Sequence, residues 1–175
     1  MRLSPVTAEQ SGKIDAYREC KRGAMDQKPD EFDSQIRQHI YEVTLGRGYP
    51  PTLAETSGHF RVAVPDVKAA FERLAAGHII VLQGDTAEIL MANPFSAVPT
   101  PFLVELAEFS CYGNCIWDAL GIPAILHKDA RIKTACGDCG TAMEVKVING
   151  TVQGAVGLVH FAIPALHWWD DIVFN

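Results

Sequence analysis

The sequence predicts an α+β protein with two domains behind an N-terminal arm. Helix-like segments dominate residues 31–77, a β-hairpin pattern follows over 78–91, and a proline-rich linker over 93–101 leads into a second mixed region. A length of 175 residues suits one large domain or two small ones. The expected divisions are an arm or helix over 1–30, a compact domain over 31–96, and a mixed α/β domain with a small antiparallel sheet over 97–175.

Residues 31–96 carry the pattern of a winged-helix-like domain, with three helices and then two strands. The helices are expected over 35–43, over 53–58 and from Pro65 to Gly77, and the strands over 78–82 and 87–91. Ser34 and Thr52 are suited to cap the first two helices, and Gly46 and Gly48 are expected to end the first. Three helices followed by a hairpin are the winged-helix arrangement.

The second domain is expected to combine short strands with one short helix. A strand is predicted over 102–106, a helix over 115–120 closed by Gly121 and Pro123, a hairpin of 131–135 with 143–147, and a strand over 156–163. His160 in that last strand is interpreted as a core histidine. The aromatic and acidic segment 167–171 is interpreted as packing onto the core, with the wall of a pocket as the alternative.

Composition excludes several classes of protein. Lys and Arg number 15 and Asp and Glu 21, so 15 − 21 gives a net charge of −6, and 48% of residues are hydrophobic. Such a chain is not disordered as a whole, and its acidic balance argues against a broad nucleic-acid-binding surface. The N-terminal stretch is charged throughout and the apolar runs are strand-sized, so neither a signal peptide nor a membrane span is expected. We predict a cytoplasmic location.

The winged-helix-like domain itself is predicted to be structural. Its third helix would be the one to enter the DNA groove, where binders of this class usually carry a basic cluster. The stretch from Arg61 to Met91 contains three basic and four acidic residues, so its net charge is −1. The basic residues are Arg61, Lys68 and Arg73, and the acidic ones are Asp66, Glu72, Asp85 and Glu88. Nucleic acid is therefore an unfavoured partner.

Five cysteines are the most informative residues. They are Cys20, Cys111, Cys115, Cys136 and Cys139. An odd number in a chain without an export signal argues against a disulfide scaffold and points to thiol or metal chemistry.

The segment around Cys115 suits a nucleophile. Asn114 is expected to cap a helix, which would place Cys115 in the first turn, where the helix dipole favours a thiolate and lowers the thiol pKa. Asp118 follows three positions later on the same face, so the pair is expected to share one proton and to couple nucleophilic attack to proton delivery. The alternative is that Cys115 is a small buried hydrophobe and Asp118 a solvated helix residue.

Cys136 and Cys139 form a Cys-x-x-Cys motif flanked by glycines on a predicted hairpin turn. Two thiolates in such a knuckle can bind a soft metal such as Zn²⁺, and Cys111 and Cys115 would complete a set of four ligands. The alternative is a reduced hairpin without metal. A redox dithiol is less favoured, because such motifs usually open a helix after a strand.

Taken together, these residues resemble the alkylmercury (organomercurial) lyase family over roughly residues 31–175. The resemblance rests on the winged-helix-like domain, on Asn114 to Ala124, on the strand pair around Cys136 and on His167 to Phe174. It implies cleavage of a carbon–mercury bond in a small organomercurial, giving hydrocarbon and Hg(II) in mercury detoxification. It also implies that small thiols take part and that no external cofactor is needed.

The resemblance also implies residue roles. Cys115 corresponds to the first catalytic cysteine, Asp118 to the carboxyl that takes part in protonating the leaving carbon, and Cys136 to a cysteine usually given a structural role. The family's second catalytic cysteine follows the segment similar to 168–174, and no cysteine follows Cys139 here. Three explanations remain open: a natural short relative that no longer cleaves the bond, a truncated chain, or a second thiolate supplied by Cys111, Cys136 or Cys139.

Two rival functions come from other classes. One is a non-enzymatic thiol protein that binds Zn or Hg through Cys111, Cys115, Cys136 and Cys139. The other is a metal-responsive regulator that binds DNA through the winged helix.

Overall fold

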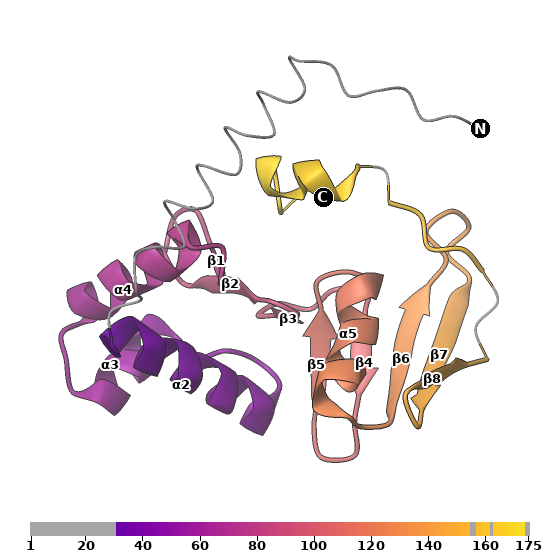
Figure 1. Ribbon diagram of the computed structural model, residues 1–175, viewed down its shortest axis with the longest axis horizontal. Helices are drawn as coiled ribbons and strands as arrows, with labels where there is room; N and C mark the ends of the chain where they lie inside the picture. The colour runs from indigo at the N-terminus through magenta and orange to yellow at the C-terminus, as the bar shows by residue number, and fades with distance from the viewer. Residues whose placement is uncertain (1–30, 155–156, 162, 174–175) are drawn as a thin grey trace, which may run out of the picture. The chain divides into compact units, whose positions relative to one another are not determined.

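A computed structural model of the chain describes residues 31–154, 157–161 and 163–173 (Figure 1). The arm predicted over 1–30, with Cys20, lies outside these residues. The chain divides into two compact units: the first holds Pro50–Ala92 with the residues up to Thr44, and the second holds Leu45–Tyr49 with the chain from Asn93 onward. None of the described helices is long and apolar enough to cross a membrane.

The first unit consists of three helices followed by a hairpin. These elements are α2 (Glu31–Arg47), α3 (Leu53–Phe60), α4 (Val64–Ala76), β1 (Val81–Leu82) and β2 (Ile89–Ala92), and the two strands pair antiparallel. Their shared core includes Ile36 and Ile40 of α2, Phe71 of α4 and Ile80, all of which are fully buried. The order of elements is the predicted one, whereas the winged-helix assignment and the limits at 31, 96 and 97 stay predictions.

The prediction for the first helix was wrong at its start and half right at its end. Instead of being capped by Ser34, α2 begins at Glu31, because Asp33 is buried and accepts two hydrogen bonds from the Arg73 guanidinium of α4, at 2.7 and 2.6 Å. The helix runs through Gly46 and ends at Arg47, directly before Gly48, which was the other predicted stop. Gly48 then adopts a φ of +92°, and a Cβ there would overlap the carbonyl oxygen of Ser110.

The next two helices begin as the sequence predicts. Thr52 caps α3, with its hydroxyl accepting from the Glu55 backbone while the Glu55 carboxylate accepts from the Thr52 backbone. Pro65 lies in the first turn of α4, and Gly77 caps its end. The strand predicted from residue 78 starts later, because His78 turns at a φ of 59° and the Ile79 N–H still bonds the Leu74 carbonyl of α4.

The second unit is an antiparallel sheet with one helix and a short 3₁₀ turn. Its elements are β3 (Phe95–Ser96), β4 (Leu103–Glu105), β5 (Ser110–Gly113), α5 (Ile116–Leu126), β6 (Ala130–Ala135), β7 (Ala142–Ile148), β8 (Thr151–Gln153) and η1 (Ala165–Asp170). The strand order is β3-β5-β4-β6-β7-β8. The predicted α+β class with an antiparallel sheet is confirmed.

One helix, α5, packs against β5, β4 and β6 (Figure 1). The prediction that it closes at Gly121 was wrong, since it continues through Pro123 to Leu126. Ile122 and Pro123 are buried, so packing against the sheet offsets the hydrogen bond that proline cannot donate. The helix begins at Ile116, three residues after β5 ends at Gly113.

The strand predicted over 156–163 does not form within the described residues 157–161. Leu158 is 99% exposed and His160 is exposed as well, so His160 is not the core histidine that the pattern predicted. A run of apolar residues alone did not make a strand here, because no neighbouring strand pairs with this part of the described chain.

Substitution of Gly113 by alanine should loosen α5. A Cβ at residue 113 would lie 2.7 Å from the Ala119 backbone nitrogen and 2.9 Å from its Cα. We expect Gly113→Ala to cost about 1–3 kcal/mol of unfolding free energy, measured by urea denaturation. Gly121→Ala is the matched control, since nothing lies within 4 Å of a Cβ there and alanine favours a helix. Equal stabilities of the two variants would contradict this packing.

Candidate functional site

Cys115 lies between the end of β5 and the start of α5. It is itself the N-cap of the helix, with φ −141° and ψ −178°, so the prediction that Asn114 caps the helix was wrong by one residue. The thiol sulfur accepts the Asp118 backbone N–H, and the Asp118 carboxylate accepts the Cys115 backbone N–H at 3.3 Å. This reciprocal pair is a capping box in which a cysteine takes the place usually held by serine or threonine.

The two side chains also contact each other directly. The Cys115 thiol donates to Asp118 Oδ2 across 3.4 Å, and both residues are half-buried. The expectation that they share one proton stays a prediction, and the contact it needs is present. A thiol that gives up its proton at this place has an acceptor in contact with it.

The prediction of a lowered thiol pKa was wrong. Burial raises the pKa of Cys115, and the negative charge of Asp118 and its hydrogen bond raise it further, against the lowering effect of the backbone N–H groups of Asp118 and Trp117. Burial also raises the pKa of Asp118, against hydrogen bonds from Cys115 and Asn114. The dipole of one helix turn is outweighed, because the thiolate would be desolvated beside a carboxylate.

This electrostatic setting predicts slow alkylation of Cys115 at neutral pH. A raised pKa means that the thiolate fraction is small at pH 7, so the rate with iodoacetamide should climb as the pH rises beyond the ordinary cysteine range. Cys139 should react first, because its hydrogen bonds lower its pKa to about 7. Peptide mass spectrometry after timed labelling measures both rates in one sample. A Cys115 that labels as fast as Cys139 at pH 7 would contradict the prediction.

Two asparagines support the carboxyl from outside the helix. Asn114 hydrogen-bonds the Asp118 carboxylate, and its Nδ2 donates to Asn93 Oδ1 at 3.2 Å. The buried Oδ1 of Asn114 has no partner among the described residues. Sequence reasoning missed Asn93, because the two asparagines lie 21 positions apart and no local pattern joins them.

The four cysteines of the second unit are not brought into one metal site. Within the described residues, no group of three or more His, Cys, Asp or Glu side chains could hold a metal ion. Cys111 on β5 is 1% exposed, and burial raises its pKa to about 12. The prediction that Cys111, Cys115, Cys136 and Cys139 bind one metal ion is therefore corrected. Cys111 is buried in the core, and a tetrahedral zinc site needs four ligands that the described residues do not bring together.

Cys136 and Cys139 remain as a pair on the turn between β6 and β7. The Cys136 N–H donates to Thr141 O and the Gly140 N–H to Cys136 O, both at 2.9 Å, which closes a tight hairpin turn. Cys139 is exposed, and its Sγ lies 3.2 Å from Thr141 Oγ1. The predicted hairpin is thus observed with both thiols free.

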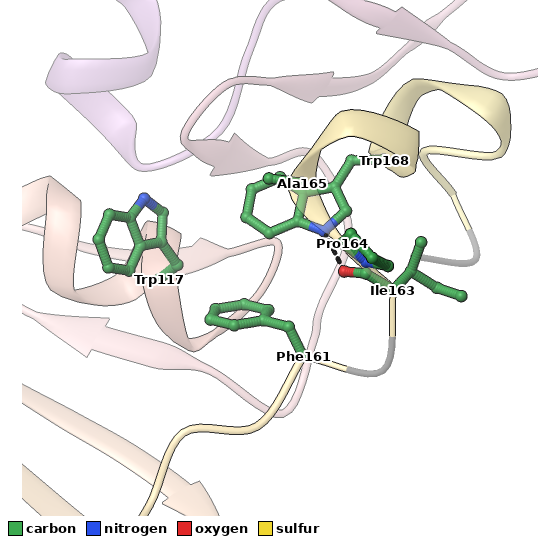
Figure 2. A pocket seen from close by; sticks show the side chains of 6 residues that line it. All are labelled: Trp117, Phe161, Ile163, Pro164, Ala165 and Trp168. Carbon is green, nitrogen blue, oxygen red and sulfur yellow. Dashed lines mark hydrogen bonds between the residues drawn. The ribbon is translucent and has the colours of Figure 1, made fainter. Parts of the chain in front are cut away.

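An aromatic hollow of about 390 Å³ is lined by Trp117, two positions after Cys115 in the chain (Figure 2). Trp117 of α5 is 63% exposed and faces Phe161, with ring centroids 6.4 Å apart; Phe161 in turn lies 5.3 Å from Trp168 of η1. The Trp168 indole N–H donates to the Ile163 carbonyl at 2.9 Å. Of the segment 167–171, Trp168 alone lines this hollow, as the pocket-wall alternative to core packing expected for the segment.

Comparison with known proteins gives two findings. Residues 95–174 match the model of the alkylmercury lyase family, MerB. Among solved structures, the crystal structure of the mercury-bound form of MerB2 is similar, with 22% identity and a TM-score of 0.56, over 77% of this chain and 64% of that chain. No curated protein matches. The chain thus spans less than two thirds of that relative's length, and at this identity the likeness shows a shared fold.

Proposed function

Starting from the match of residues 95–174 to the alkylmercury lyase family, we propose that this chain cleaves the carbon–mercury bond of small organomercurials. The observation that carries the proposal is the direct hydrogen bond from the Cys115 thiol to the Asp118 carboxylate, 3.4 Å long. It joins a soft nucleophile for mercury to an acid that can protonate carbon, and the reaction needs both.

Cys115 is the group that binds mercury in this proposal. Mercury is a soft ion and prefers thiolate sulfur, so it displaces the thiol proton that the raised pKa of Cys115 otherwise holds in place. Asp118 accepts this proton, since its carboxylate already contacts the sulfur. Burial raises the pKa of Asp118 as well, which makes the protonated carboxyl easier to form.

Asp118 then delivers the proton to the carbon that leaves mercury. For an organomercurial carried by a small thiol, R–Hg–SR′, the balance is R–Hg–SR′ + Cys115–SH → R–H + Cys115–S–Hg–SR′. One Hg–S bond forms, the C–Hg bond breaks with its electron pair going to carbon, and the thiol proton ends on carbon. No other bond forms or breaks, and no external cofactor is consumed.

The second sulfur on mercury is assigned to a small thiol. Cys111 is a poor candidate, because it is buried with a pKa of about 12. No third Cys, His, Asp or Glu of the described residues joins Cys115 and Asp118 in a group that could hold a metal. A thiol from solution can reach the half-buried Cys115 and supply the second bond.

The test is release of hydrocarbon. The full chain is incubated with phenylmercury or methylmercury and an excess of small thiol, and benzene or methane is measured by gas chromatography against a protein-free control. We expect release that depends on the chain and saturates with organomercurial. Tight mercury binding without hydrocarbon would overturn the lyase and leave a thiol protein that captures mercury.

The DNA-binding alternative gains no support from the first unit. On α4, Lys68 pairs with Glu72 at 3.9 Å and Arg73 with Asp33 at 2.6 Å, so both cations are matched by carboxylates. A phosphate-binding helix needs cations that face solvent without such partners.

A further inference from the structure

The hairpin turn between β6 and β7 carries a pair of thiols that the proposed reaction does not use. Cys136 ends the turn's first arm, directly after Ala135, and Cys139 lies at its tip. Backbone hydrogen bonds from Cys136 to Thr141 and from Gly140 to Cys136, together with a left-handed Gly140 at φ +69°, fix the path of the chain between the sulfurs. The turn joins β6 and β7, which pair antiparallel over six residues of β6 and so hold the two ends of the turn together.

The two sulfurs lie together and are open to solution. They lie three residues apart on one tight turn that the Cys136 and Gly140 backbone hydrogen bonds close, and neither is in a disulfide; Cys139 is exposed and Cys136 half-buried. Cys139 Sγ also lies 3.2 Å from the Thr141 hydroxyl, which orients it on the turn. An incoming ion or small thiol complex can therefore reach both sulfurs without opening the fold.

The donor set selects the kind of ion. Zn²⁺ in a structural site needs four ligands, and the described residues offer no third Cys, His, Asp or Glu in a group with these two. Two thiolates alone satisfy a soft ion of linear coordination, of which Hg(II) is the strongest thiol binder. The Asp138 carboxylate on the same turn is a hard ligand and does not alter this preference.

We propose that Cys136 and Cys139 form a second, two-coordinate binding site for Hg(II), separate from Cys115. The choice of Hg(II) among soft ions rests on the proposed function, whose product it is. The exchange is Hg(SR)₂ + Cys136–SH + Cys139–SH → Cys136–S–Hg–S–Cys139 + 2 RSH. Two Hg–S bonds break and two form, both protons leave on the departing thiols, and no electron is transferred. The hairpin would thus hold the ion as a chelate after small thiols bring it.

The test uses inorganic Hg(II) on chains that lack the catalytic thiol. All variants carry Cys20→Ser and Cys115→Ser; one keeps Cys136 and Cys139, two lose one of them to serine, and one loses both. Each is mixed with HgCl₂ and a tenfold excess of glutathione and desalted, and mercury per chain is measured together with the thiolate-to-mercury absorption in the ultraviolet. Circular dichroism checks that each variant folds, and buried Cys111 is present in all four.

We expect the chain with both thiols to retain one Hg(II), and loss of either thiol to lower retention against glutathione by tenfold or more, because a chelate needs both sulfurs. Equal retention by the chain without Cys136 and Cys139 would overturn the proposal. Since no variant here can release hydrocarbon through Cys115, the result is independent of the lyase assay.

Discussion

Substitution of Cys115 by serine should abolish hydrocarbon release from organomercurials, by about a thousandfold or more in kcat/KM. A serine hydroxyl can still cap α5 and accept the Asp118 backbone N–H, so the local fold is retained. What is lost is the soft sulfur, and hydroxyl oxygen is a poor ligand for mercury. The experiment therefore separates the structural role of residue 115 from its chemical one.

The measurement is benzene formation from phenylmercury by wild type and Cys115→Ser, with thermal melting to compare their folds. Cys111→Ala is the matched control, because it removes a thiol that is buried and held protonated. This control should lose about 1 kcal/mol of stability and keep its turnover. If turnover instead fell with Cys111 and survived without Cys115, the assignment of the nucleophile would be wrong.

The elements that sequence predicted well are those set by local chemistry. Thr52 with Glu55 makes a capping box within four residues, and Pro65 lies in the first turn of α4. The turn around Cys136 and Cys139 needs only its glycines and flanking strands. The errors arise where a contact between residues far apart in the sequence sets the end of a helix. Asp33 extends α2 through Arg73, 40 positions away, and burial of Ile122 and Pro123 carries α5 past Gly121. No local pattern contains these contacts.

In the candidate site, too, local spacing was predicted correctly, whereas properties that depend on burial were not. The spacing of Cys115 and Asp118 predicted their contact, since residues three apart at a helix start lie on one face. The sign of the thiol pKa shift was missed, because desolvation depends on what covers the sulfur and not on its place in the helix. The metal set of four cysteines failed for a related reason: alternation along β5 turns Cys111 into the core.

Substitution of Asp118 by asparagine should speed the binding of mercury to Cys115 and slow the cleavage of the carbon–mercury bond. The negative charge and the carboxylate hydrogen bond both raise the pKa of Cys115, so their removal should lower it toward the ordinary cysteine range. The thiolate fraction at neutral pH then rises, and mercury should bind to Cys115 faster. The amide oxygen can still accept the Cys115 backbone N–H and keep the start of α5 in place.

Cleavage should fall in the same variant, because an amide neither takes the thiol proton nor delivers it to carbon. Loss of a general acid usually costs about 10²–10⁴-fold in rate. Stopped-flow binding of an organomercurial and gas chromatography of the hydrocarbon measure the two steps on one protein, and Asp85→Asn, an exposed turn residue in the first unit, controls for the lost charge. If Asp118 merely shaped the helix start, both steps would weaken together. Faster capture with lost cleavage requires a carboxyl that holds the proton between sulfur and carbon, which is the role the contact at 3.4 Å supports.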